Sequence, residues 1–460
     1  MIKAYVSNDI FIETPTPAIL RWCRQNLVIP NPDYYKKLSM GKWTGGTDEY
    51  ISLYEKDGGA LRLPFGCLRA LRNAFMGNIV FINKIRYIDG TINYQSEIKL
   101  YDYQEKAVEY ALEARNGVLV MPCGSGKTQS ALEIISRIGG KCLWLTHTQD
   151  LLNQSLNRAK STLGIDANSY GTITGGKVNI GSGITFATVQ TMTKLDLKKY
   201  KDEWDIIIVD ECHKAIGSPT RVMQFYKVLS NLSCRYKIGL TATPKRADGL
   251  EQSMFALLGG IIYEVSREAV ADTTCPIRVQ EVETGYYPDC ESVLAGDGTI
   301  NYAELVDDLT HNVQRLDLVS NVLKTLDGAI LVLANRVEYL QELERRYEGR
   351  SICLSTLGRS KSAKAERKEA LRRLNNGELD CIFATYQLAK EGLDVPQLRY
   401  VVFATPEKDE TTVTQSAGRV GRKAEGKEFG TVVDFIDDFG MYRGWAKKRK
   451  GFYKKLNING

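Results

Sequence analysis

Short apolar runs alternate with longer segments of helical periodicity from about residue 100 onward. The runs are rich in β-branched residues and show no polar alternation, which is typical of strands buried on both faces of a parallel sheet. Helical segments between such strands indicate an α/β fold. The predicted buried strands are GVLVMP, KCLWLT, GITFAT, DIIIVD, YKIGLT, GAILVLA, DCIFAT, YVVFATP and GTVVDFI.

The strand series divides into two halves, each the size of an ordinary domain. We predict two tandem α/β domains with parallel sheets, at residues 97–268 and 269–460, the second ending in a basic tail. Residues 1–96 differ, because Pro, Gly and Tyr are frequent there and interrupt any long helix. This N-terminal segment is therefore expected to form a small α+β domain of its own.

Composition narrows the class of protein. Of the 460 residues, 43% are hydrophobic and 25% charged, as in soluble globular proteins. The 10 cysteines include no C-x-x-C pair and only 3 histidines are present, which indicates neither a disulfide framework nor a zinc site. No apolar run is long enough to cross a bilayer, and the N-terminus lacks a secretory core. We expect an intracellular, cytoplasmic protein, and the net charge of +6 favours an anionic partner only weakly.

The segment VLVMPCGSGKTQS joins a predicted strand to a predicted amphipathic helix. Backbone N–H groups at such a junction, with the positive end of the helix dipole, bind phosphate oxygens. Lys127 is expected to reach the β and γ phosphates and Thr128 to ligate Mg²⁺. A glycine-rich turn with an exposed lysine is the alternative, and Met121 replaces the first glycine of the usual pattern. The predicted phosphate-binding residues are Gly124, Ser125, Gly126, Lys127 and Thr128.

An acidic pair, Asp210 and Glu211, ends the predicted strand DIIIVD. In this position Asp210 is expected to hold Mg²⁺, while Glu211 orients and deprotonates an attacking water. An Asp-Glu pair by itself is more often a solvated loop charge. Its place at the end of a buried strand, downstream of the glycine-rich loop, favours the catalytic interpretation.

The segment TQSAGRVGRK in the second half contributes three more candidates, Gln415, Arg419 and Arg422. The two arginines are one helical turn apart, so we predict that they share a helix face. Ordinary surface charge is one interpretation, and ligation of a phosphate is the other. An arginine finger can contribute about 10³ to 10⁵ in rate. We therefore expect the phosphate loop and acidic pair in the first domain to be completed by these residues from the second.

These segments belong to a longer ordered series. It consists of LYDYQ, PCGSGKT, LTHTQDLLNQ, TFATVQTM, DECH, LTATP, LVLANRVEYLQEL, FATYQLAKEGLDVPQL and QSAGRVGR. In order and spacing this series resembles the motifs of superfamily 2 helicases of the DExH type. The resemblance implies two RecA-like motor domains, ATP and Mg²⁺ as cofactors, and ATP-driven work on nucleic-acid strands.

The resemblance also implies roles for single residues. Gln104 is expected to read the adenine edge, and Gly392 and Asp394 to approach the ribose and phosphates. Thr241 and Thr243 are expected to link nucleotide state to domain closure. Small hydroxyl and amide groups suit contact with the phosphate–sugar backbone, although a capping or turn role is the commoner explanation of a single threonine. The DNA contacts implied are Thr146, Thr174, Gly175, Thr188, Gln190, Asn335, Arg336 and Thr385.

Within the superfamily, MPCGSGKT, DECH and GLTATPKRADGL are most similar to the XPB-type and UvsW-type branch and to helicases of T5-like phages. One departure is Ala247, which stands where XPB-type proteins have the glutamate of an Arg-Glu-Asp triplet. The compact plan implies a monomer that acts on branched DNA at forks or junctions. Trp43 and Tyr50, with neighbouring lysines, are candidates to grip the duplex, and the basic segment at 445–457 is another; core aromatics and a solvated helix are the respective alternatives.

Three other functions share these features. An RNA helicase is the first, because it has the same motor and no motif here reads a 2′-hydroxyl. The motor of a restriction or nuclease system would need a carboxylate site, and Asp89, Glu97 and Lys99 have a spacing that some Mg²⁺ nucleases use. A nucleotide-dependent clamp that does not separate strands is the third.

Overall fold

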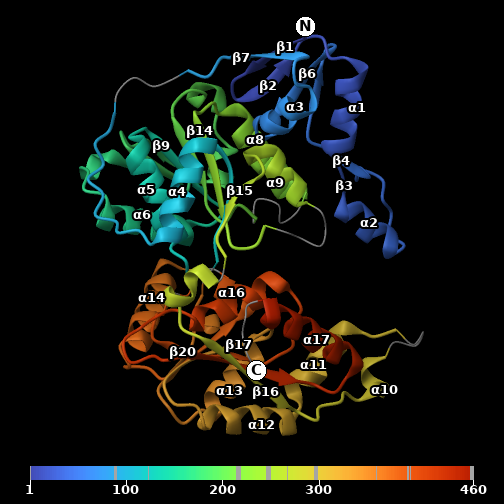
Figure 1. The fold of residues 1–460 in the computed structure, drawn as a ribbon. Coiled ribbons are helices and arrows are strands. Elements are labelled where there is room, and N and C mark those ends of the chain that lie inside the picture. The colour runs from blue at the N-terminus through green and yellow to red at the C-terminus, as the bar shows by residue number, and fades with distance from the viewer. Residues whose placement is uncertain are drawn as a thin grey trace. The chain divides into compact units, whose positions relative to one another are not determined.

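The computed structural model describes residues 2–86, 91–122, 124–213, 219–244, 250–266, 268–294, 299–358, 360–390, 393 and 395–455 (Figure 1). The chain forms two compact units, the first comprising 1–122 and 126–266 and the second 123–125 and 267–460. Four residues singled out from the sequence lie outside the described part: Asp89, Ala247, Gly392 and Asp394.

An eight-stranded sheet of order β11-β10-β12-β9-β13-β14-β8-β15 forms the centre of the first unit. Its neighbouring strands run parallel except at the β10–β11 hairpin. The strands are β8 (Asn116–Val120), β9 (Cys142–Thr146), β10 (Tyr170–Thr174), β11 (Lys177–Asn179), β12 (Ile184–Thr188), β13 (Ile206–Val209), β14 (Tyr236–Thr241) and β15 (Ile261–Glu264). The parallel sheet predicted for this half is confirmed.

Helices connect these strands and bury one apolar face each. In α5, for example, Ala131, Leu132, Ile134 and Ile135 are buried at helical spacing, as the sequence predicts. The helices are α4 (Asp102–Ala114), α5 (Lys127–Ile138), α6 (Gln149–Thr162), α7 (Val189–Met192), α8 (Pro219–Asn231) and α9 (Glu251–Leu258), with short 3₁₀ turns η2 (Ala167–Ser169) and η3 (Leu197–Tyr200).

The N-terminal segment builds its own mixed sheet within the first unit, of order β5-β6-β2-β1-β7. A second pair, β3 and β4, lies beside helix α2. The strands are β1 (Ile2–Val6), β2 (Asp9–Ile12), β3 (Val28–Pro30), β4 (Tyr50–Ser52), β5 (Glu55–Asp57), β6 (Ala60–Pro64) and β7 (Ile79–Asn83), with helices α1 (Pro17–Asn26), α2 (Pro32–Ser39), η1 (Phe65–Cys67) and α3 (Leu68–Ala74).

The turn η1 joins this N-terminal sheet to the large sheet. The Cys67 thiol donates to the Ala256 carbonyl of α9, and the Lys237 ammonium of β14 lies 4.9 Å from the centre of the Phe65 ring. A Cβ on Gly66 would stand 2.4 Å from the Gly259 nitrogen and 2.6 Å from the Ala256 oxygen, so only glycine fits here. The apolar cores of the two sheets merge into one cluster.

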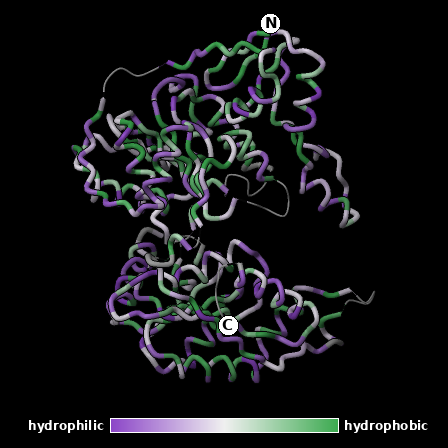
Figure 2. Tube along the Cα trace, in the orientation of Figure 1, coloured by the Kyte–Doolittle hydropathy of each residue, from purple (hydrophilic) through white to green (hydrophobic). Residues whose placement is uncertain are grey.

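A parallel six-stranded sheet of order β16-β21-β20-β17-β19-β18 forms the centre of the second unit. The strands are β16 (Ile277–Glu283), β17 (Ala329–Ala334), β18 (Ser351–Cys353), β19 (Cys381–Thr385), β20 (Leu398–Phe403) and β21 (Gly430–Ile436). The helices are η5 (Glu268–Thr273), α10 (Cys290–Val293), α11 (Tyr302–His311), α12 (Val313–Lys324), α13 (Val337–Arg346), η6 (Leu354–Thr356), α14 (Lys361–Asn375), α15 (Tyr386–Lys390), α16 (Glu410–Val420) and α17 (Gly440–Lys455). Hydrophobic residues run through the interior of each unit (Figure 2).

The basic segment at 445–457 is largely a packed helix. In α17 the Arg449 side chain is buried and pairs with Asp434 at 2.8 Å, and Tyr453 also donates to Asp434. Lys450 pairs at the surface with Glu281. The described part of the segment is thus only partly exposed to solvent, because Arg449 is buried in the interior. Among the helices of the described residues, none is both long and apolar enough to cross a bilayer.

Candidate functional site

The candidate residues of the first unit gather at the carboxyl edge of its parallel strands. Thr146, the last residue of β9, pairs in register with Thr188, the last residue of β12. Asp210 follows β13 directly, and its N–H donates to the Leu145 carbonyl of β9 at 2.9 Å. In open α/β sheets, ligands bind at this edge. The glycine-rich loop after β8 and Thr241 at the end of β14 belong to the same edge, because Thr241 pairs with Val120.

The glycine-rich loop ends where α5 begins at Lys127. Gly126 has φ +77°, a left-handed conformation that favours glycine. A Cβ at this position would lie 2.3 Å from the Gln104 amide nitrogen, so the glycine also allows that amide to approach. The Lys127 ammonium lies 3.4 Å from the Met121 carbonyl. Residue 121 thus contacts the lysine through its backbone, for which a methionine serves as well as a glycine.

Gln104 is buried at the start of α4, where its amide has a structural partner. Its side-chain oxygen accepts the Tyr101 N–H at 3.0 Å, in a capping box that fixes the amide beside the loop. The rings of Tyr101 and Tyr103 stack 5.7 Å apart, and Tyr101 is exposed. An exposed ring and a fixed amide beside a phosphate loop fit the predicted contact with a planar base.

Asp210 is a buried acid with an unusual charge environment. Burial and the neighbouring Glu211 carboxylate raise its pKa from 3.8 to about 6, against the lowering effect of Lys127. Its carboxylate accepts the Glu211 N–H at 2.9 Å and the Ser155 hydroxyl of α6 at 3.4 Å. A carboxylate in this setting favours a bound cation, which would replace repulsion by attraction.

Glu211 is held in a strained conformation. Its φ of +49° is uncommon for any residue other than glycine and costs about 1 kcal/mol. The His213 Nδ1 lies 3.3 Å from the Glu211 carboxylate and 2.9 Å from the Thr241 hydroxyl. The same hydroxyl lies 3.1 Å from the N–H of Thr243, which donates to it. His213 thus joins the acidic pair to the segment at 241–243.

The predicted DNA contacts of the first unit also have local structural roles. The Thr146 hydroxyl donates to the Thr148 carbonyl at 2.9 Å, and the Thr188 hydroxyl lies 2.9 Å from that of Thr191. The exposed Gln190 amide donates to the His147 carbonyl at 2.8 Å. Thr174 and Gly175 lie at the β10–β11 turn, where Gly175 has φ +58°. These residues lie at the carboxyl ends of the neighbouring parallel strands β10, β12 and β9, and so share one edge of the sheet.

In the second unit, the corresponding edge carries three of the predicted contacts. Thr385 ends β19 in register with Ala334 of β17, so Asn335 and Arg336 follow on the adjacent strand. The Asn335 amide donates to the Pro406 carbonyl at 3.1 Å, and Arg336 is exposed as the cap of α13. The Thr385 hydroxyl accepts the Leu388 N–H and so caps α15.

Gln415 and Arg419 lie on α16, but Arg422 does not. The helix ends at Val420 with Gly421 as its cap, so the prediction that both arginines share a helix face is wrong. Arg422 instead forms a bridge with Thr274 at the entry to β16. The Arg419 guanidinium donates to the backbone carbonyls of Ala389 and Leu393. Arg419 thereby holds the segment after α15.

Two residues of the first unit were missed by the sequence interpretation. His213 was present in DECH but had no assigned role, and Ser155 lies on α6, whose sequence carries no signal for contact with Asp210. The histidine's place two residues after the glutamate was the available signal.

The donor set of the first unit fits ATP with Mg²⁺. Left-handed Gly126, with φ of +77°, opens the loop backbone at the start of α5, and Lys127, Thr128 and Asp210 supply a cation, a hydroxyl and a carboxylate. No cluster of three or more His, Cys, Asp or Glu able to hold a metal occurs among the described residues. A Mg²⁺ bound mostly by phosphates and water needs only one or two protein ligands. Glu97 and Lys99, the described members of the nuclease alternative, are exposed.

Two family models match the chain. Residues 97–246 match the type III restriction enzyme res subunit, and residues 314–424 match the helicase conserved C-terminal domain. The DNA 3′-5′ translocase XPB2 of Sulfurisphaera tokodaii is 28% identical over 72% of this chain and 80% of that protein. The mimivirus protein L396 of Acanthamoeba polyphaga mimivirus, provisionally named an ATP-dependent RNA helicase, is 26% identical over 77% and 67%. D10 of Escherichia phage T5, provisionally named a helicase, is 25% identical over 72% and 70%.

Proposed function

The chain belongs to the superfamily 2 helicases and is an ATP-dependent DNA helicase or translocase, and on that premise we propose that it acts on branched DNA. In this proposal the protein moves along one arm of a fork or junction and drives strand separation or branch migration. ATP hydrolysis drives the movement, Mg²⁺ is the metal cofactor, and the protein acts as a monomer.

Hydrolysis depends first on the acidic pair of the first unit. Glu211 orients the attacking water and accepts its proton, and the strained backbone at φ +49° aims the carboxylate. Lys127 binds the β and γ phosphates beside the α5 N-terminus, and Gln104 with Tyr101 holds the base. When bound, Mg²⁺ neutralises phosphate charge, and Thr128 and Asp210 are the residues expected to hold it.

The second unit supplies the cations that stabilise charge developing on the transferred phosphate. We assign this role to Arg422, with Gln415 and Arg419 beside it and with Gly392 and Asp394 expected near the ribose. Arg419 has the additional task of holding the carbonyls of Ala389 and Leu393. His213 contacts both Glu211 and Thr241, so a change at Glu211 during hydrolysis would be transmitted through this ring to the segment at 241–243.

The DNA path is expected along the carboxyl edges of the two sheets. Hydroxyl and amide groups there, Thr146, Thr188 and Gln190 in the first unit and Asn335 and Thr385 in the second, contact the phosphate–sugar backbone without reading sequence. Arg336 adds an exposed cation at the same edge of the second sheet. Because such contacts ignore base identity, they suit a motor that steps along any sequence.

One observation favours a branched substrate: the first unit presents a second exposed surface, on α2 and the loop that follows. No residue of α2 is buried, and Trp43 is 83% exposed. Tyr50 is also exposed, and Lys37 is tied to the loop through Thr47. Large apolar side chains exposed together mark a binding surface, and aromatic rings stack on unpaired bases. The first unit thus has two candidate DNA-binding surfaces, the carboxyl edge of its large sheet and the aromatic surface at α2. Two surfaces suit a branched substrate, because each could bind a different arm.

A strand-displacement panel tests this function. We expect forks and four-way junctions to be processed faster than tailed duplexes, and Trp43→Ala to remove that preference while leaving ATP hydrolysis on single-stranded DNA unchanged. Met76→Ala is the matched control, because Met76 is 80% exposed in the same N-terminal segment but follows α3 and not α2. Equal unwinding of RNA duplexes would instead support the RNA helicase function, and equal rates on all DNA forms would contradict the branched substrate.

A further inference from the structure

We propose that Lys427 is a positioning residue for Arg422, and that it acts on hydrolysis by fixing the backbone that carries this arginine. Lys427 lies on the loop between α16 and β21, five residues after Arg422. This inference rests on the proposed role of Arg422 and adds to it a residue that the sequence motifs do not include.

The Lys427 ammonium is turned inward onto backbone carbonyls. Its side chain is buried, with 7% exposed, and the ammonium donates to the Arg422 carbonyl at 2.9 Å and to the Pro396 carbonyl at 3.1 Å. Pro396 follows the segment that Arg419 holds from the other end, at Ala389 and Leu393. One cation thus ties the loop after α16 to the segment that follows α15.

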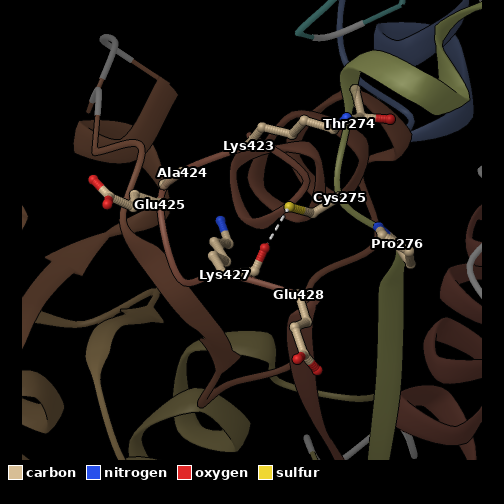
Figure 3. A pocket seen from close by; sticks show the side chains of 8 residues that line it. All are labelled: Thr274, Cys275, Pro276, Lys423, Ala424, Glu425, Lys427 and Glu428. Atoms are coloured by element: carbon tan, nitrogen blue, oxygen red, sulfur yellow. Dashed lines mark hydrogen bonds between the residues drawn. The ribbon is translucent and has the colours of Figure 1, made fainter.

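The rest of the loop is held by hydrogen bonds from Gln397, Arg399 and Cys275 to its backbone carbonyls. The Cys275 N–H donates to the Gly421 carbonyl at 2.8 Å, and its thiol donates to the Lys427 carbonyl at 3.3 Å (Figure 3). Next to these contacts lies a pocket of about 400 Å³ lined by Thr274–Pro276 and by loop residues including Lys423 and Glu428. Close packing cannot fix a loop that borders open space, so its shape depends on such polar ties.

The charge on Lys427 is sensitive to pH near neutrality. Burial lowers its pKa from 10.5 to about 8; the Cys275 thiol acts in the opposite direction, and Arg422 and Arg399 add to the lowering. Glu425 and Glu428 are the acids that line the adjacent pocket, and Lys423 is its other cation. Below about pH 8 the ammonium is charged and binds both carbonyls strongly, and above it the neutral amine binds them less well.

The test measures ATP turnover stimulated by forked DNA in single and double variants. We expect Lys427→Met to lower kcat roughly 10- to 100-fold with KM for ATP unchanged, as for a displaced group that acts in the transition state. In an Arg422→Ala background, Lys427→Met is expected to add no further loss. Lys423→Met is the control, because Lys423 is exposed on the same loop and lines the same pocket.

A second variant keeps the test decisive if Lys427→Met does not fold. Lys427→Arg keeps a permanent charge, and the adjacent pocket has room for the longer side chain. We expect it to retain turnover and to lose the decline through about pH 8 that we predict for the wild type. Lys427→Met or Lys427→Arg turnover that matches the wild type at every pH would overturn the inference. Unchanged turnover in Arg422→Ala alone would instead contradict the proposed role of that arginine.

Discussion

Each of the two parallel sheets buries an aspartate, and the two environments are opposite. In the second unit, the Asp434 carboxylate of β21 receives Arg449 at 2.8 Å and the Tyr453 hydroxyl at 2.9 Å, both from α17. In the first unit, Asp210 has the like-charged Glu211 as its neighbour, and burial with this repulsion raises its pKa to about 6. A paired buried charge holds a fold together, whereas a carboxylate kept beside another carboxylate is prepared for a cation.

The largest effect is expected from Glu211→Gln, which removes the proposed base and keeps the shape of the side chain. We expect kcat for DNA-stimulated ATP hydrolysis to fall roughly 10²- to 10⁴-fold, with the melting temperature unchanged. Steady-state turnover and circular dichroism of the purified variant measure the two quantities. Wild-type turnover would contradict the catalytic interpretation of the acidic pair.

Asp434→Asn tests the paired aspartate. Removing one partner of a buried pair leaves the Arg449 charge uncompensated, which costs about 3 to 5 kcal/mol. We therefore expect the unfolding transition of the second unit to move to lower guanidinium concentration. The control is Glu281→Gln, because the Glu281–Lys450 pair of the same helix is exposed and contributes little. Equal midpoints for the two variants would show that the buried pair is not needed for stability.

Asp210→Asn should have the smallest effect on stability, and with the opposite sign. The folded-state pKa of about 6 exceeds the ordinary 3.8, so the wild type binds more protons when folded and loses stability as pH rises through about 6. Asparagine does not ionise, so we expect the variant to be more stable than the wild type at pH 7 by up to about 3 kcal/mol and to match the wild type near pH 4. Thermal melts at both pH values measure this. Destabilisation at pH 7 would mean that Asp210 is a structural acid like Asp434.

The sequence predicted the strands at the centres of the two sheets and missed those at their edges. Runs such as DIIIVD and GTVVDFI are buried on both faces, which leaves a continuous apolar signal. By contrast neither β16 nor β15, which lie at the edges of the two sheets, has a buried residue. Strands of this kind mix polar and apolar positions and resemble loops in sequence.

At the candidate site, the order of motifs predicted which residues share an edge of each sheet, but not how they are held. The register of Thr146 with Thr188 follows from parallel strands, and so does the place of Asp210. Nothing in the pattern shows that α16 ends at Val420, because Arg422 and its neighbours are compatible with a longer helix. The burial of Lys427 and Arg449 is likewise invisible, because their partners are a backbone carbonyl and a distant acid.

The joint at Gly66 has a mechanical consequence. There the main chain of the N-terminal module lies directly against the main chain of α9, without an intervening side chain that changes rotamer. A joint of this kind has little slack, so a displacement of α9 would carry η1 and the adjoining strand β6 with it. The N-terminal sheet is then mechanically part of the first unit and not a tethered accessory.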